Sequence, residues 1–209
     1  MPVLIKDDKF ILFIHVPKTG GSFVELFFKH NGYKIAYLDR GLNVPNLNDI
    51  RLCSPQHMHA PILRETFDLD KFDHIFMSVR HPVKRLLSEY RMRLDPLYPV
   101  DFNDWFTDIF EEYQKNPYVN DNHIRPQHEF WIEGARVFKQ EDKFAASWAA
   151  EVEREFNLTF PRKVFGSAES SQKKRRFSIG TDAIRQENKD KILALYEKDF
   201  DVFDYTPTL

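Results

Sequence analysis

Residues 10–23 read FILFIHVPKTGGSF, and this stretch decides the fold. Its first seven residues form a nearly continuous apolar run, which is typical of a strand that is covered on both faces of a parallel sheet. A proline ends the run, a glycine pair follows, and apolar residues then recur at helical spacing. Ser22 and Glu25 match a capping box, so we expect a helix that begins at Ser22 and ends near Asn31. The stretch therefore predicts a strand, a glycine turn at the carboxyl edge of a sheet, and a helix.

The same alternation continues along the chain, where apolar segments predict strands and amphipathic stripes predict helices. The expected strands are residues 34–38, 74–79 and 136–138. One helix is expected to start at Pro82, and a second to cover residues 102–113 behind an Asp101 cap. Two more are expected from Phe144 to Phe156 and, at the end of the chain, from Ile192 to Phe203. Strands that alternate with helices predict a single α/β domain over residues 1–209, with a central parallel sheet flanked by helices. Two segments without periodicity, 116–127 and 158–180, are loops of a length that is usually functional or mobile.

The composition excludes several classes of protein. The chain has 209 residues with 30 Lys and Arg against 32 Asp and Glu, a formal net charge of −2, whereas a general nucleic-acid or membrane-surface binder needs a clear basic excess. The N-terminal apolar segment is too short for a signal peptide, and no apolar run approaches the ~20 residues of a membrane helix. The single cysteine, Cys53, excludes an internal disulfide and fits a reducing compartment. We therefore expect a soluble, cytoplasmic protein without nucleic-acid or membrane partners.

The turn at residues 17–23 carries the clearest functional signal. Backbone N–H groups at a helix N-terminus are unsatisfied donors, and glycines allow an anion to come close to them. Lys18 adds a full positive charge at the same place. An ordinary turn with a capping serine is the alternative, but Pro-Lys-Thr and the buried strand before it favour a phosphate site. The turn is not a Walker A loop, because Lys18 precedes both glycines, and the next strand ends in Arg80 rather than in an acidic residue for magnesium. No metal is expected.

A second cationic site is expected at residues 80–88. Arg80 lies at a strand end, and Ser88 lies on the following helix, on the side away from its apolar stripe. An exposed serine beside a surface Arg85 is the ordinary alternative. Next to Lys18, however, Arg80 and Ser88 can form a second phosphate clamp. Two phosphate sites one strand apart suggest a nucleotide that is phosphorylated at both ends of its ribose.

These motifs resemble those of the sulfotransferases that use 3′-phosphoadenosine 5′-phosphosulfate (PAPS). HVPKTGGSF at 15–23 is similar to the 5′-phosphosulfate loop of that family, above all in its carbohydrate, heparan sulfate 2-O-like branch, and VRHPVKRLLSEY at 79–90 is similar to its 3′-phosphate motif. RPQ at 125–127 and LYEKDFDVF at 195–203 are also similar to that branch. The resemblance implies a P-loop NTPase-like sulfotransferase topology, PAPS as donor, 3′-phosphoadenosine 5′-phosphate (PAP) as product, and a hydroxyl acceptor that is expected to be a saccharide.

The resemblance also implies roles for individual residues. Lys18 would contact the bridging oxygen and the 5′-phosphate, while Arg80 and Ser88 would hold the 3′-phosphate. The residues that would wrap the 5′-phosphate are Thr19, Gly20, Gly21, Ser22 and Phe23. In the family a loop before the final helix closes the nucleotide site, and its candidates here are Ser170 and Lys173. They lie in or beside a basic run for which a solvated patch and a localisation signal are the alternatives.

A base for the acceptor proton is expected between the two phosphate motifs, in the segment SPQHMHA. A positioned imidazole suits this proton transfer, and residues spaced by two on an extended segment face one side. The His-x-His pair at this place resembles the heparan 2-O enzymes. We therefore predict His57 as the base, with His59 as its alternative or as an acceptor contact. His15 is expected to pack inside the first strand, whereas His123 and His128 are candidates to line the acceptor cleft.

The predicted function is metal-free transfer of a sulfuryl group from PAPS to a hydroxyl. His57 would take the acceptor proton, and Lys18 would stabilise the departing phosphate. A metal-dependent phosphotransferase on the same fold is the first alternative, and it should bind ATP with magnesium. The second alternative is a non-catalytic module that keeps the nucleotide clamp, and the intact His-x-His pair argues against it.

Overall fold

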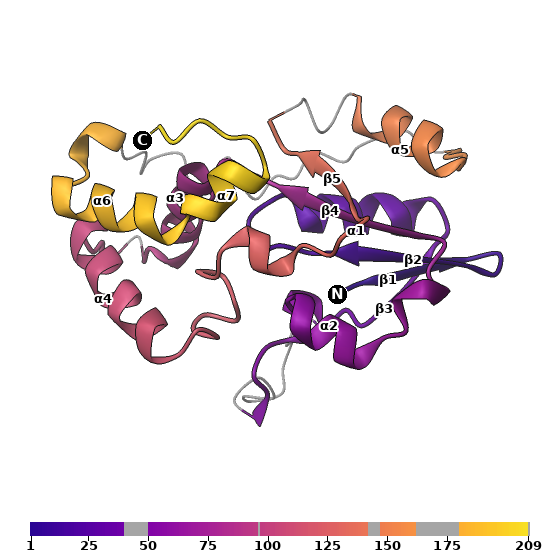
Figure 1. Ribbon diagram of the computed structural model, residues 1–209, viewed down its shortest axis with the longest axis horizontal. Coiled ribbons are helices and arrows are strands. Elements are labelled where there is room, and N and C mark those ends of the chain that lie inside the picture. The colour runs from indigo at the N-terminus through magenta and orange to yellow at the C-terminus, as the bar shows by residue number, and fades with distance from the viewer. Residues whose placement is uncertain (40–49, 96, 142–146, 162–179, 209) are drawn as a thin grey trace.

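The computed structural model describes residues 1–39, 50–95, 97–141, 147–161 and 180–208, and within them five strands form one mixed sheet. The strands are β1 (Val3–Lys6), β2 (Lys9–Ile14), β3 (Lys34–Ala36), β4 (His74–Val79) and β5 (Arg136–Lys139). The helices are α1 (Gly21–His30), α2 (Ala60–Thr66), α3 (Pro82–Arg93), α4 (Phe102–Lys115), α5 (Trp148–Phe156), α6 (Gln186–Leu195) and α7 (Glu197–Val202) (Figure 1). The single-domain α/β class is confirmed.

The prediction of a parallel sheet is correct only for the side of the sheet that β2, β4 and β5 form. The strand order is β3-β1-β2-β4-β5, and β2, β4 and β5 are parallel, but β1 is antiparallel to both of its neighbours. Asp7 and Asp8 connect β1 to β2 with positive φ values of 48° and 62°. Two successive positive φ angles are typical of the tight hairpin turns whose twist matches antiparallel strands. The antiparallel strands therefore lie on one side of the sheet, and the parallel part keeps the arrangement that positions the site.

The parallel pairing of β2 with β4 brings the two predicted phosphate motifs to one edge of the sheet. Ile14 at the end of β2 is paired with Met77 near the end of β4. The chain therefore leaves both strands at nearly the same level, towards the glycine turn in one case and towards Arg80 in the other. A hydrogen bond of 2.9 Å between the hydroxyls of Thr19 and Ser78 ties the turn to β4.

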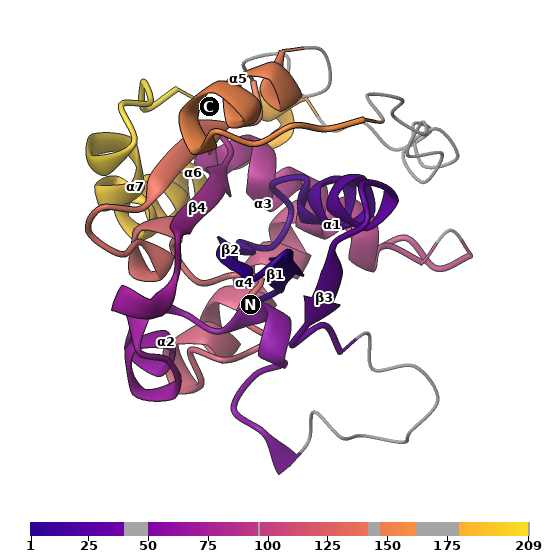
Figure 2. The same ribbon diagram turned by 90° about the vertical axis from the view of Figure 1, so that its right-hand side faces the viewer.

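Two apolar clusters cover the faces of the sheet, and a third lies beyond its carboxyl edge. α1 and α5 cover one face with an aromatic-rich cluster that includes Phe28, Phe76 and Trp148, as the many phenylalanines predict. α2 packs on the other face through Leu63. Buried residues of α3, α4, α6 and α7 form the third cluster, and these helices gather at one end of the molecule (Figure 1), the end that lies away from the viewer in Figure 2. No helix within the described ranges combines the length and the apolar character that crossing a membrane requires.

Most helix ends agree with the sequence. Pro82 is the first residue of α3, and the carboxylate of Asp101 accepts the N–H of Asn103 at the start of α4, 2.9 Å away. α1 ends with Asn31 as its C-cap. α5 begins at Trp148, while Phe144, the first residue of the predicted helix, lies outside the described residues.

Two helix predictions are wrong. α1 begins at Gly21, and its N-cap is Gly20, which has no side chain that could cap the helix. Glu25, which was expected to complete a capping box with Ser22, is instead buried in the interior. The single helix predicted at the end of the chain is divided into α6 and α7 at Tyr196. This tyrosine is fully buried, and its hydroxyl donates to the carbonyl of Ile124 at 2.9 Å. Tertiary packing of one side chain therefore interrupts the helical pattern.

Candidate active site

The glycine turn offers backbone groups to a ligand. Lys18 and Gly20 have positive φ values of 69° and 93°, so the backbone curls before α1 begins. The first hydrogen bond at the start of the helix runs from the N–H of Phe23 to the carbonyl of Gly20, 2.9 Å. The N–H groups just before this bond are the ones that a helix start leaves for an anion. Alternating backbone conformations of this kind form the concave nests in which phosphates bind.

The side chains of the turn are divided between the interior and the surface. Thr19 is fully buried, and its hydroxyl donates to the carbonyl of Val16 at 2.8 Å, besides its bond to β4. Phe23 packs edge to face on Trp148 with ring centroids 5.7 Å apart. Ser22 is exposed. The side chains of Thr19 and Phe23 therefore hold the turn in place, and the predicted wrapping of a phosphate would fall to the backbone at residues 19–22.

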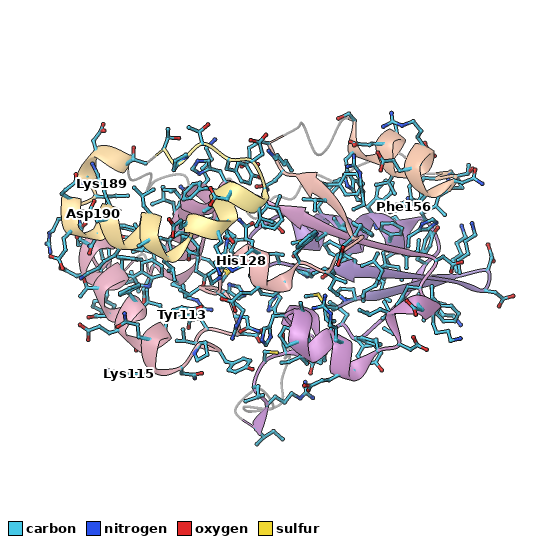
Figure 3. The ribbon with its side chains drawn as sticks, viewed as in Figure 1. Tyr113, Lys115, His128, Phe156, Lys189 and Asp190 are labelled. Carbon is cyan, nitrogen blue, oxygen red and sulfur yellow. The ribbon has the colours of Figure 1, made fainter. Side chains whose placement is uncertain are left out.

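Arg80 is held in place by two motifs from much later in the chain. Gln127 accepts the N–H of Arg80 at 2.9 Å and donates to its carbonyl at 2.8 Å. Asp199 of α7 accepts the N–H groups of Gln127 and His128, each at 2.8 Å, and both Gln127 and Asp199 are fully buried. His128 lies close to α7 in Figure 3, and its ring also contacts Asp199. The RPQ and LYEKDFDVF segments thus meet and fix the position of Arg80 at the end of β4.

Lys18 and Arg80 come together at the carboxyl edge of the sheet, next to the helix that carries Ser88. The guanidinium of Arg80 donates to the carbonyl of Lys18 at 3.4 Å, and the ammonium of Lys18 lies 3.2 Å from the sulfur of Met92 on α3. Ser88 precedes Met92 by four residues, so both lie on the same face of that helix. Burial lowers the pKa of Arg80 from its ordinary value. The structure therefore brings Lys18 and Arg80 together, and Ser88 lies on the face of α3 that Lys18 reaches through Met92.

His57 is fixed by a loop that is distant in sequence. Its Nδ1 lies 2.7 Å from the carboxylate of Asp121, which also accepts the N–H and the hydroxyl of Ser54 at 2.5 and 2.6 Å. Asn122 donates to the carbonyl of His57 at 2.8 Å. Burial lowers the pKa of His57, although the hydrogen bond to Asp121 opposes this effect. A neutral imidazole whose Nδ1–H donates a hydrogen bond to a carboxylate keeps Nε2 as a proton acceptor.

The loop that delivers Asp121 has an unusual backbone. Asn120, Asp121 and Asn122 are consecutive residues with positive φ values of 51°, 58° and 65°. Each such residue costs roughly 1–2 kcal/mol relative to right-handed backbone, and Asn and Asp tolerate it best. The guanidinium of Arg85 donates to carbonyls of residues 123–125 and secures the loop. Arg85 is 1% exposed, so the alternative of a surface arginine is wrong. Strain of this kind is typically retained at functional sites.

Two further imidazoles flank His57. Its ring centroid lies 5.0 Å from that of His15 and 4.9 Å from that of His123, edge to face in both cases. The Nδ1 of His15 lies 2.7 Å from Glu25, within ion-pair distance but without hydrogen-bond alignment. The Nδ1 of His123 lies 2.6 Å from Glu89. His15 lies one residue beyond the end of β2, and it is buried and stacked on Phe13 as its expected packing role predicts, but its ring also joins this cluster.

The imidazole cluster touches the glycine turn. A β-carbon added to Gly21 would lie 2.0 Å from Nε2 of His15, far inside van der Waals contact. Gly21 itself has ordinary helical backbone in α1. Glycine is therefore required at this position by the close approach of a side chain, and the contact joins the candidate phosphate site to the ring next to His57.

The two histidines of the His-x-His pair occupy different surroundings. His57 ends a short 3₁₀ turn (Pro55–His57) and His59 is the N-cap of α2, so the expectation of one extended segment is wrong. The ring of His59 lies edge to face on Tyr118, with centroids 5.6 Å apart, and among the described residues its buried Nδ1 has no hydrogen-bond partner. Burial, helped by the charge of Arg125, lowers the pKa of His59 to about 4.

Some predicted residues are not placed, and some contributors to the site were not predicted. Ser170 and Lys173 lie outside the described residues. Sequence reasoning missed Glu89 and Asp121, which orient predicted residues, and it gave no such role to Glu25, Gln127 and Asp199, although it named the motifs that contain them. For Asp121 a signal was available, because an Asn-Asp-Asn run inside an aperiodic loop favours left-handed backbone.

Comparison with known proteins identifies the class to which this α/β fold belongs. A model of the sulfotransferase family matches residues 1–206. The chain therefore belongs to the sulfotransferase family, and it is a transferase enzyme of the kind that moves sulfuryl groups. No curated protein and no solved structure matches the chain.

Proposed function

We propose that this sulfotransferase moves the sulfuryl group of PAPS to a hydroxyl, on a saccharide acceptor as its resemblance to the heparan 2-O-like branch implies. Sulfotransferases generally use PAPS as the donor. The observation that carries the proposal is the anchoring of His57: a carboxylate holds its Nδ1, and its ring lies one imidazole away from the glycine turn. This arrangement provides a proton acceptor beside a candidate anion site, as sulfuryl transfer to a hydroxyl requires.

The donor is proposed to lie across the carboxyl edge of the sheet, in a P-loop NTPase-like manner. The N–H groups of residues 19–22 would bind its 5′-phosphate, and Lys18 would neutralise charge at the bridging oxygen. Arg80 and Ser88 would bind the 3′-phosphate. The close approach of Arg80 to the Lys18 carbonyl supports a single ligand that spans both positions.

The chemistry assigned to the protein is proton transfer and charge stabilisation. Nε2 of His57 would accept the proton of the acceptor hydroxyl, while Asp121 stabilises the imidazolium that forms. Lys18 would stabilise the negative charge that develops on the leaving phosphate as the S–O bond breaks. A sulfuryl group carries less charge than a phosphoryl group, so placement and these cations are proposed to suffice without a metal. His59 is the alternative base.

The test separates donor binding from turnover. PAP should raise the melting temperature of the protein, while ATP and AMP should not, because only PAP fills both phosphate positions. Lys18→Ala and Arg80→Ala should abolish this shift. His57→Ala should keep it and lower turnover by roughly 10²- to 10⁴-fold, the range for a general base.

His30→Ala is the matched control, since His30 is an exposed histidine at the end of α1. Turnover that survives in His57→Ala but is lost in His59→Ala would move the role of the base to His59. Stabilisation by ATP with magnesium in preference to PAP would overturn the proposed donor.

A further inference from the structure

His57, Asp121 and His123 form a set of metal-ligand type within the described residues. Each offers one ligand atom, and the three atoms all lie within 4.8 Å of one another. Two imidazoles and a carboxylate are donors that Zn²⁺ and neighbouring transition-metal ions bind well. His57 is 7% exposed and the other two are partly buried, so the set differs from a group of acidic side chains on a surface.

The ligand side chains are already oriented by a second layer of hydrogen bonds. Glu89 holds Nδ1 of His123 at 2.6 Å, which leaves Nε2 of that ring for another partner, and Arg93 in turn donates to Glu89 at 2.7 Å. The carboxylate of Asp121 accepts two hydrogen bonds from Ser54. A carboxylate that fixes the second nitrogen of a histidine is the typical support of a metal-binding imidazole.

The charges around the set also favour a dication. Three carboxylates, those of Glu25, Glu89 and Asp121, lie against the three imidazoles of the cluster. Arg93 pairs with one of them, and Lys18 is a second cation whose charge acts on His123. Among the ion pairs that the described residues form at the cluster, the carboxylates therefore outnumber the Lys and Arg cations.

We propose that His57, Asp121 and His123 form a binding site for one transition-metal dication of the Zn²⁺ type, and that the bound ion inhibits the enzyme. The ion would lie between Nδ1 of His57 and the Asp121 carboxylate, in place of the proton they share, and Nε2 of His123 would be the third ligand. Zinc with three protein ligands keeps a fourth position for water. The ring proton of His57 would move from Nδ1 to Nε2.

Inhibition follows from this tautomer. Nε2 of His57 is the atom that accepts the acceptor proton, and it can no longer do so once it carries the displaced ring proton. This consequence rests on the proposed function, whereas the metal site itself does not.

Co²⁺ tests the site without any need for turnover, because it takes the same ligands as Zn²⁺ and its visible absorption reports nitrogen ligation at low coordination number. Titration of the full chain, freed of metal with a chelator, should give one bound Co²⁺ per chain, which Zn²⁺ displaces. Asp121→Asn and His123→Gln should each weaken binding at least tenfold, and Glu89→Gln by about 10- to 100-fold. His30→Gln, at an exposed histidine, should leave the titration unchanged.

The possible results either uphold or overturn the proposed metal site. A titration without the absorption bands, or equal affinity in folded Asp121→Asn and His123→Gln, would overturn the site. If one variant fails to fold, the wild-type spectrum and the other variant still decide. Active wild-type enzyme that is indifferent to saturating Zn²⁺ would overturn the inhibition. Bound Co²⁺ in a protein that never transfers sulfuryl groups would uphold the site and contradict the proposed function alone.

Discussion

The glycine turn and the imidazole cluster are neighbouring parts of one candidate site, but they are built in different ways. The turn consists of consecutive residues, 17–23, and its ligand-binding groups are backbone N–H groups that any chain with this local conformation presents. The cluster around His57 is assembled from five separate segments, and each imidazole is oriented by a carboxylate from elsewhere in the chain. A site made of backbone thus follows from local conformation, whereas the orientation of a side chain depends on distant partners.

The two regions should therefore respond differently to substitution. Changes in the cluster are expected to affect turnover and leave nucleotide binding intact, and changes near the turn are expected to affect binding. Gly21 and His15 join the two regions, so a substitution at this contact is expected to affect both nucleotide binding and turnover.

Asp121→Asn should have the largest effect. An amide at this position donates to Nδ1 of His57 and so places the ring proton on Nε2, the wrong nitrogen for a base. Turnover should fall by roughly 10³- to 10⁴-fold, as it does when the orienting carboxylate of a Ser-His-Asp triad is replaced. Steady-state kinetics and PAP thermal shifts on the same preparation provide the measurement. Loss of PAP binding together with turnover would show that the cluster and the turn are not separable.

Gly21→Ala should disturb both regions, because the added methyl group would lie 2.0 Å from the ring of His15. We expect a loss of roughly 1–3 kcal/mol in the free energy of unfolding, typical of overpacking, and a weaker PAP shift. Denaturant unfolding provides the measurement. His15→Ala in the same chain should restore most of the stability by removing the clash. A double variant no more stable than Gly21→Ala would rule out this contact as the cause.

Gln127→Ala should affect the nucleotide edge alone. Its amide makes two hydrogen bonds to the backbone of Arg80, so its loss leaves a partly buried N–H and carbonyl without these partners, at a cost of about 1 kcal/mol for each group. We expect PAP affinity to fall about tenfold as Arg80 loses its position. Calorimetric titration with PAP measures this. Among the described residues Gln127 is hydrogen-bonded to Arg80 and Asp199 and to none of the clustered histidines, so turnover at saturating donor should change less than affinity.

Substitutions of Asn120 should have the smallest effect, confined to the loop that carries Asp121. At its φ of 51°, Asn120→Ala should lower the free energy of unfolding by about 1 kcal/mol, while Asn120→Gly should be tolerated, because only glycine escapes the steric cost of left-handed backbone. Thermal unfolding of the two variants side by side measures the difference. Equal stability would argue that the loop is not strained.

Much of the scaffold could be read from local patterns. The strand predicted at residues 74–79 is β4 as observed, and Pro82 begins α3 because proline suits a first helical position. The strand and glycine turn at residues 10–20 were predicted on the same local basis. The β1–β2 hairpin was not, because Asp7 and Asp8 form a tight turn only when two antiparallel strands are available on either side.

The partners of the functional residues could not be read in this way. Asp121 lies 64 residues from His57, and Asp199 lies 72 residues from Gln127. Neither periodicity nor spacing encodes which carboxylate meets which ring. For the same reason Glu25 was expected at a helix cap, although in the folded chain it faces His15.

By itself the amino-acid sequence determined elements that depend on neighbouring residues: the strands β2 and β4, the starts of α3 and α4, and a glycine turn with Lys18 beside it. Only the tertiary structure decided that the rings of His15 and His123 contact the ring of His57, and that each of the three lies against a carboxylate. It also decided that the ring of His15 packs against Gly21. The physical reason is the distance along the chain over which each kind of interaction acts. Backbone conformation follows from steric and hydrogen-bonding preferences within a few residues, whereas the orientation of a buried titratable side chain is determined by whichever distant group the fold places against it.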